Sequence, residues 1–157
     1  MKKLPQSDET LLVRTDFSND TVWKSICAAV RVPDPDMQEA LGMFAEVNEK
    51  MGQPLGDFEL PMRMVDDPEY KDVSPDKLVE LSAGAPQSIL LAVDSITISQ
   101  PDHPVLIIDL AVEPGRTFRA VPSQIFAIES NLSIANMDWQ DFAESVDDDG
   151  VFRGFPK

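Results

Sequence analysis

The chain has 157 residues, of which 43% are hydrophobic and 26% are charged, values typical of a soluble globular protein with a sizeable core. It carries 28 acidic residues against 13 lysines and arginines, and the resulting net charge of −15 argues against a surface for the phosphate backbone of nucleic acid. No apolar stretch reaches the ~18 residues that a membrane-spanning helix needs. The single cysteine excludes an internal disulfide, and the N-terminus lacks the apolar core of a secretory signal, so we expect a cytoplasmic protein without nucleic-acid or membrane partners.

The first residues of the chain predict a strand followed by a helix. Residues 11–15 form a short run typical of a strand, which ends at Asp16, and Ser18 is placed to cap the next helix. Cys27 lies on the apolar face of that helix. We interpret it as a small core residue rather than a nucleophile, because a buried thiol resists ionisation.

A second helix is predicted from Met37 to Met51, with Asp36 in capping position at its start. Residues 34–57 are therefore an extra helix or an insertion in a chain that otherwise forms a single globular domain over residues 1–157. After a loop, residues 59–65 alternate apolar and other side chains, which predicts a strand near an edge of the sheet.

The centre of the fold is predicted at residues 89–93 and 105–108, two short apolar runs that are each followed by an aspartate. Such runs are typical of strands that are buried on both faces. The dipeptide Ser74-Pro75 marks the start of a helix before the first run. Between the two runs, residues 95–104 are compatible with extended structure or with a helical turn.

The last third of the chain predicts a hairpin and then helices. A turn at residues 113–116 makes residues 117–121 the antiparallel partner of the strand before it. A helix follows and ends before residues 131–136, which we expect to be irregular or briefly extended, and Asp138 caps the final helix. The aromatic residues 151–155 are expected to pack back on the domain.

The order of these elements predicts an α/β fold. The early alternation of strands and helices is typical of parallel strands joined by crossovers, whereas the hairpin adds an antiparallel pair. We therefore expect one domain of three layers, in which a mixed and centrally buried sheet of about five strands is covered by helices.

Aspartates follow three of the predicted strands, namely Asp16, Asp94 and Asp109. Ligands of open α/β sheets bind at the carboxyl ends of strands, so converging carboxylates there would suit Mg²⁺ and a phosphate ester. Aspartate is also common wherever a strand passes into a turn or a helix cap. Asp94 and Asp109 converge only if their strands are parallel neighbours; an antiparallel pair would place them at opposite ends.

Other polar residues are candidates for ligand contacts. Asn131 and Asn136 bracket a loop and either hydrogen-bond a ligand or satisfy their own backbone. His103 is either a base oriented by Asp102 or an exposed loop residue, and we favour the second interpretation. Arginines suit carboxylate or phosphate ligands but also pair with nearby acids, and the four that stand out are Arg14, Arg116, Arg119 and Arg153.

Four segments resemble a family of small bacterial proteins of unknown function, found mostly in actinobacteria: RTDF at 14–17, GRTFR at 115–119, NLSIANMD at 131–138 and GVFRGF at 150–155. The resemblance covers nearly the whole chain, apart from residues 34–56, which are longer than the family pattern. It implies a self-contained bacterial domain and supplies no activity, cofactor or site.

Two functions remain open from the sequence. The first, which we favour, is a non-enzymatic binding module without a cofactor, such as an inhibitor or immunity protein. Its contact surface for a basic partner is Asp141, Glu144 and the run of Asp147, Asp148 and Asp149, although the same acids are also typical of a solvated helix end. Further candidate contacts are Asp16, Arg119, Asn131 and Asn136. The second is a Mg²⁺-dependent hydrolase that uses Asp16, Asp94 and Asp109. The sequence holds no glycine-rich phosphate loop and no Gly-x-Ser-x-Gly elbow.

Overall fold

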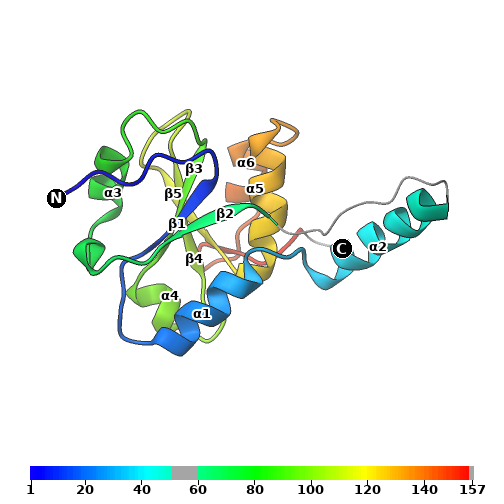
Figure 1. Ribbon diagram of the computed structural model, residues 1–157, viewed down its shortest axis with the longest axis horizontal. Coiled ribbons are helices and arrows are strands. Elements are labelled where there is room, and N and C mark those ends of the chain that lie inside the picture. Colours follow the sequence, from blue (N-terminus) through cyan, green and yellow to red (C-terminus); the bar gives the residue numbers. More distant parts are fainter. Residues whose placement is uncertain (51–59, 156–157) are drawn as a thin grey trace.

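A mixed sheet forms the centre of the protein (Figure 1). The computed structural model describes residues 1–50 and 60–155 of the chain. Within these residues six strands pair in the order β2-β1-β3-β4-β5-β6. β1 is parallel to β2 and β3, β4 is antiparallel to β3 and β5, and β6 is parallel to β5. The strands are β1 (Thr10–Arg14), β2 (Met62–Val65), β3 (Ile89–Val93), β4 (Val105–Asp109), β5 (Thr117–Ala120) and β6 (Val151–Phe152).

The predicted α/β fold with a mixed sheet is confirmed. β3 and β4 are buried along their whole length, as their apolar runs predicted, and β2 lies at an edge. The sheet has one strand more than expected, because the C-terminal residues pair with β5 instead of merely packing on the domain. None of the described helices is long and apolar enough to cross a bilayer.

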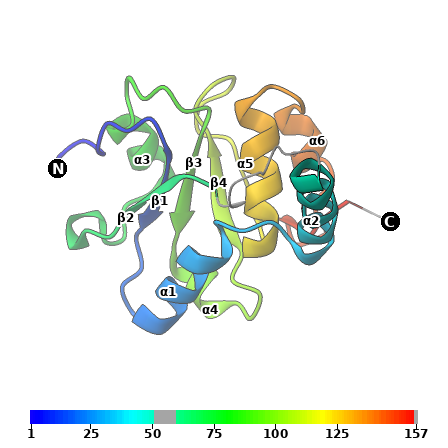
Figure 2. The same ribbon diagram turned by 45° about the vertical axis from the view of Figure 1, so that its right-hand side comes forward.

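Helices cover both faces of the sheet, and each face has its own core (Figure 2). Because strand side chains alternate between faces, Leu91 and Ile107 pack under α1 (Asp20–Ala29), α5 (Ile125–Ser133) and α6 (Trp139–Ala143). Leu90 and Ile108 face the other way, toward α3 (Pro75–Leu81) and the turn η1 (Pro68–Tyr70). The result is the predicted arrangement of a sheet between helical layers.

Local capping decides where the helices begin. α1 is capped by Asn19, whose side chain accepts from the amide of Val22 at 3.1 Å, so the prediction of Ser18 as the cap is wrong. The Ser18 hydroxyl instead donates to Asp16. Ser74 caps α3 as predicted. The segment that the sequence left open forms α4 (Ser95–Ser99), because Asp94 and Thr97 make a capping box there.

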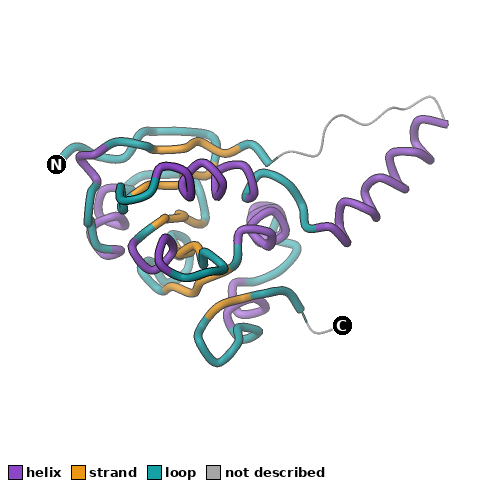
Figure 3. The backbone as a smooth tube through the Cα atoms, turned by 90° about the horizontal axis from the view of Figure 1, so that it is seen from below, coloured by secondary structure: helices purple, strands orange, loops and turns teal. Residues whose placement is uncertain are grey.

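The helix α2 (Pro35–Lys50) projects from the body of the protein (Figures 1 and 3). It begins two residues earlier than predicted, because Asp34 rather than Asp36 accepts from the amide of Met37, at 2.8 Å. The predicted helix end at Met51 and the rest of the 34–57 segment lie outside the described residues.

The C-terminal third differs from prediction at one point. α5 follows a short turn, η2 (Pro122–Gln124), and continues to Ser133, so the predicted irregular segment 131–136 is helical in its first half. The amide of the Asn131 side chain donates to the Ala127 carbonyl within the helix, at 2.7 Å, and so does not disrupt it. Asp138 forms a capping box with Asp141 at the start of α6, as the prediction of a cap required.

Candidate functional site

The strand-end aspartates do not meet. β3 and β4 are antiparallel, with Ile89 opposite Asp109, so Asp94 and Asp109 lie at opposite ends of this strand pair. Asp16 lies at the same end as Asp94, because β1 is parallel to β3. The shared three-aspartate Mg²⁺ site is therefore not formed, and no other group of three histidine, cysteine, aspartate or glutamate side chains in the described part of the chain is placed to hold a metal.

Asp94 and Arg119 form a bidentate pair at one end of the sheet. The guanidinium nitrogens lie 3.0 and 2.7 Å from the two carboxylate oxygens, and Arg119 also donates to the Pro104 carbonyl. Burial alone would raise the pKa of Asp94, but the hydrogen bonds from Arg119 and from the Thr97 amide outweigh it and hold the pKa below its ordinary value. Arg119, a predicted ligand contact, is thus bound to an internal partner.

Asp109 closes the connection between β4 and β5. Its side chain accepts from the backbone amides of Ala111, Val112 and Glu113 and from Arg116 Nε, the last at 2.6 Å. Burial raises the pKa of this carboxyl, yet the donors overcome that effect and leave the pKa lowered. A carboxylate that is satisfied in this way holds a turn and is a poor general base.

Arg14 is almost fully buried, with a side chain 4% exposed, and joins β1 to its neighbours. It contacts Asp20 at 2.6 Å and Asp66 at 3.3 Å, and its guanidinium lies 4.6 Å from the centre of the Phe17 ring. Nearby, Asp16 accepts from both the amide and the hydroxyl of Ser18. These strand-end residues stabilise the local fold.

His103 is not a base oriented by Asp102, which was one of the two interpretations of the sequence. Its ring Nδ1 lies 3.0 Å from the Thr97 carbonyl, and the residue is half-buried in a left-handed backbone conformation. Asp102 binds Arg153 at 2.7 Å instead of orienting the histidine.

An acidic surface extends over α6 and the loop after it. The chain has no lysine or arginine between Arg119 and Arg153, and Asp141, Glu144 and the run from Asp147 to Asp149 are all exposed. We call these five acids the α6 acidic surface. Its charge is offset at one point only among the described residues, at Arg153.

Arg153 divides the α6 acidic surface into two kinds of carboxylate. It binds Asp147 at 2.8 Å and Asp149 at 2.7 Å, and its hydrogen bond lowers the pKa of Asp149. Within the described residues, the carboxylates of Glu144 and Asp148 have no partner and face solvent. The predicted acidic residues are therefore exposed, but of the five only Glu144 and Asp148 carry charge that the fold does not use.

A groove of about 560 Å³ lies beside this surface. Its walls come from the first turn of α2, from α5, and from the C-terminal residues, so that Met37, Asn131 and Phe155 all line it. We call it the C-terminal groove. Asn131 lines the groove, and its side-chain Oδ1 accepts from the side-chain amide of the predicted contact Asn136 at 2.8 Å, so the two side chains bind each other.

The aromatic character of the C-terminal groove was not predicted from the sequence. Phe142, Phe152 and Phe155 form a cluster with ring centres 5.0–5.5 Å apart. Phe142 and Phe152 are buried, whereas Phe155 is 45% exposed. The signal was a phenylalanine on each side of Arg153-Gly154, which we interpreted only as packing; Gly154 has φ of +108°, a backbone conformation that suits glycine and turns the chain at Phe155.

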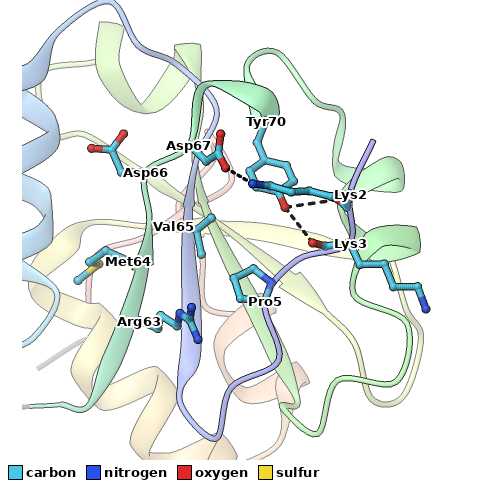
Figure 4. Close-up of a pocket in the computed structure, with 9 residues that line it drawn as sticks. All are labelled: Lys2, Lys3, Pro5, Arg63, Met64, Val65, Asp66, Asp67 and Tyr70. Carbon is cyan, nitrogen blue, oxygen red and sulfur yellow. Dashed lines mark hydrogen bonds and ion pairs between the residues drawn. The ribbon is translucent and has the colours of Figure 1, made fainter.

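A second hollow, of about 410 Å³, lies between β2 and the N-terminal segment (Figure 4). It holds three of the basic residues, but the Lys2 ammonium binds Asp67 and Glu69, and Arg63 donates to the Gln6 carbonyl. The Tyr70 hydroxyl donates to the Lys3 carbonyl at 2.9 Å. These contacts fasten the N-terminal segment to the body.

The structure is thus a mixed α/β domain in which Arg14, Arg116 and Arg119 are held in ion pairs within the chain and most of the acids lie on the surface. The chain belongs to a family described as a domain of unknown function, DUF6924, which matches residues 9–155. The predicted membership of a family of unknown function is confirmed. No curated protein matches the chain.

Proposed function

We propose that this protein is a bacterial, cytoplasmic binding module, without enzymatic activity or a cofactor, that recognises a basic protein through the α6 acidic surface. The observation that carries the proposal is the pair of exposed carboxylates, Glu144 and Asp148, on a stretch of chain without lysine or arginine. An inhibitor or immunity protein that covers a basic surface of its target would use charge in this way.

The electrostatics support recognition of a basic partner. A net charge of −15 raises the rate at which a positively charged protein meets this one, and the attraction is screened over about 8 Å at physiological salt. The strand-end carboxylates give no support to hydrolysis, because Asp94 and Asp109 are bound to arginines and lie at opposite ends of their strand pair.

The structure indicates which acids test the proposal. Replacing Asp147 and Asp149 would also release Arg153, so a loss of binding would be ambiguous. The double variant E144Q/D148N removes two charges that make no internal contact. D8N/E9Q is the matched control, since it removes two exposed acids beside β1, which three strands separate from β6.

The experiment uses the wild type and both variants as immobilised baits for a lysate of the native cell, at low and at high salt. We expect a discrete basic protein to bind the wild type and D8N/E9Q at low salt, and to be lost from E144Q/D148N. Retention of no protein, or equal retention on all three baits, would refute the proposed function.

A further inference from the structure

The C-terminal groove combines an exposed aromatic ring with carboxylates. Phe155 stands on the two buried rings of Phe142 and Phe152, which fix its position while leaving 45% of its surface exposed. The groove is also lined by Asp34 and Asp36, at the start of α2. Asp34 is held in place by Gln124, whose side-chain amide donates to it at 3.0 Å.

The charge of the groove is negative although Arg153 lines it. Arg153 is bound to Asp102, Asp147 and Asp149, so this group carries a net charge of −2, counted as one guanidinium and three carboxylates. Asp34 adds a further carboxylate, which accepts only from uncharged amides. Arg153 lines the groove and also binds two acids of the α6 acidic surface, so the two regions adjoin. A cationic side chain that approaches the acidic surface is therefore also attracted to the groove.

The protein itself shows how such groups bind a guanidinium. Arg14 lies over the Phe17 ring while it contacts Asp20, and Arg116 lies 5.0 Å from the Trp139 ring centre while it contacts Asp109. An arginine stacks flat on a ring and still reaches a carboxylate with its nitrogens, which a lysine ammonium does less well. The groove offers a ring and carboxylates of the same kind.

We propose that the C-terminal groove receives an arginine side chain of the partner, stacked on Phe155 and hydrogen-bonded to the carboxylates of the groove. This inference rests on the proposed function, since it names the residue by which a basic partner is recognised. It makes Phe155 the centre of the interface and the α6 acidic surface its charged border.

The test measures fluorescence anisotropy of a fluorescein-labelled peptide of alternating arginine and glycine. The same peptide with citrulline, a neutral isostere, in place of every arginine is the ligand control. We expect the arginine peptide alone to bind the wild type. Phe155→Ala and Phe155→Leu should each weaken binding by about three- to thirtyfold, the range of a cation–π contact, and Phe155→Tyr should retain it.

Circular dichroism of each Phe155 variant checks that it still folds. Because Phe155 is half exposed, its replacement should leave the spectrum unchanged. Phe155→Leu keeps an apolar side chain, so its loss of affinity separates ring stacking from simple hydrophobic contact. D8N/E9Q should bind the arginine peptide as the wild type does.

The outcomes distinguish the two proposals. If E144Q/D148N weakens peptide binding and the Phe155 variants do not, the groove inference is overturned and the acidic surface stands. Equal binding of the citrulline peptide, or no binding of the arginine peptide to the wild type, also overturns the inference, while the capture experiment decides on the proposed function separately.

Discussion

Replacement of Asp109 by alanine should be among the most destabilising single changes in this protein. The side chain is 4% exposed and serves four donors at the connection from β4 to β5, with Ala111 and Val112 on one oxygen and Glu113 and Arg116 on the other. Alanine leaves three backbone amides and a guanidinium without their acceptor.

The magnitude follows from these contacts. Hydrogen bonds that involve a charged group contribute about 1.5–3 kcal/mol each, and removing one partner of a buried ion pair costs about 3–5 kcal/mol. Water can reach some of the freed amides, because residues 111–113 are exposed, so we take about 3–5 kcal/mol for the whole site. For a domain of this size that corresponds to a fall in Tm of about 6–20 °C.

Urea unfolding followed by circular dichroism measures the loss. Asp109→Asn should cost about half as much, because its single oxygen can still accept from Ala111 and Val112. Glu113→Gln is the control, since it breaks a contact to the same Arg116 from an exposed side and should change stability by less than about 1 kcal/mol. If Asp109→Ala and Glu113→Gln have equal effects, the anchoring role assigned to Asp109 is wrong.

Three further results are expected. The pKa values of Asp94 and Asp109 lie below those of unfolded chains. Both carboxylates therefore stabilise the fold above about pH 4, and their contribution is lost as the pH falls further. The urea midpoints measured at pH 7 and at pH 3 should differ less for Asp94→Asn than for the wild type. Burial raises the pKa of the Cys27 thiol to about 11, so a thiol reagent at pH 8 should label it slowly until urea unfolds the protein, and rapid labelling would contradict its place against the core. Ile107→Ala, at a fully buried position in β4, should lower the free energy of unfolding by about 2–5 kcal/mol, and a loss below 1 kcal/mol would mean that this core is loosely packed.

Local patterns predicted those parts of the fold that local forces determine. The apolar runs of β3 and β4 identify strands without any knowledge of their neighbours, and Ser74 and Asp138 mark helix starts because a cap acts on amides two or three residues away. The choice of Ser18 over Asn19 as a cap was wrong by one residue, since both side chains are suitable and the nearby Asp16 takes the serine.

The candidate site depends on pairings that span long stretches of sequence. Arg153 meets Asp102 across 51 residues and Arg119 meets Asp94 across 25, and no spacing in the sequence announces either contact. The direction of β4 relative to β3 decides where Asp109 lies, and both directions were compatible with the sequence. β6 is only two residues long, which is too short for a periodic pattern in the sequence, so only its pairing with β5 in the structure identifies it as a strand.

The internal pairing of the arginines also governs how copies of this protein meet one another. Arg14, Arg116 and Arg119 each bind a carboxylate of the same chain, so most of the acids that remain lie on the surface, where they outnumber the remaining cations. Two such particles repel each other, over about 30 Å in 0.01 M salt but only about 3 Å in 1 M salt. Dilute buffer therefore keeps the molecules dispersed, and concentrated electrolyte allows close approach.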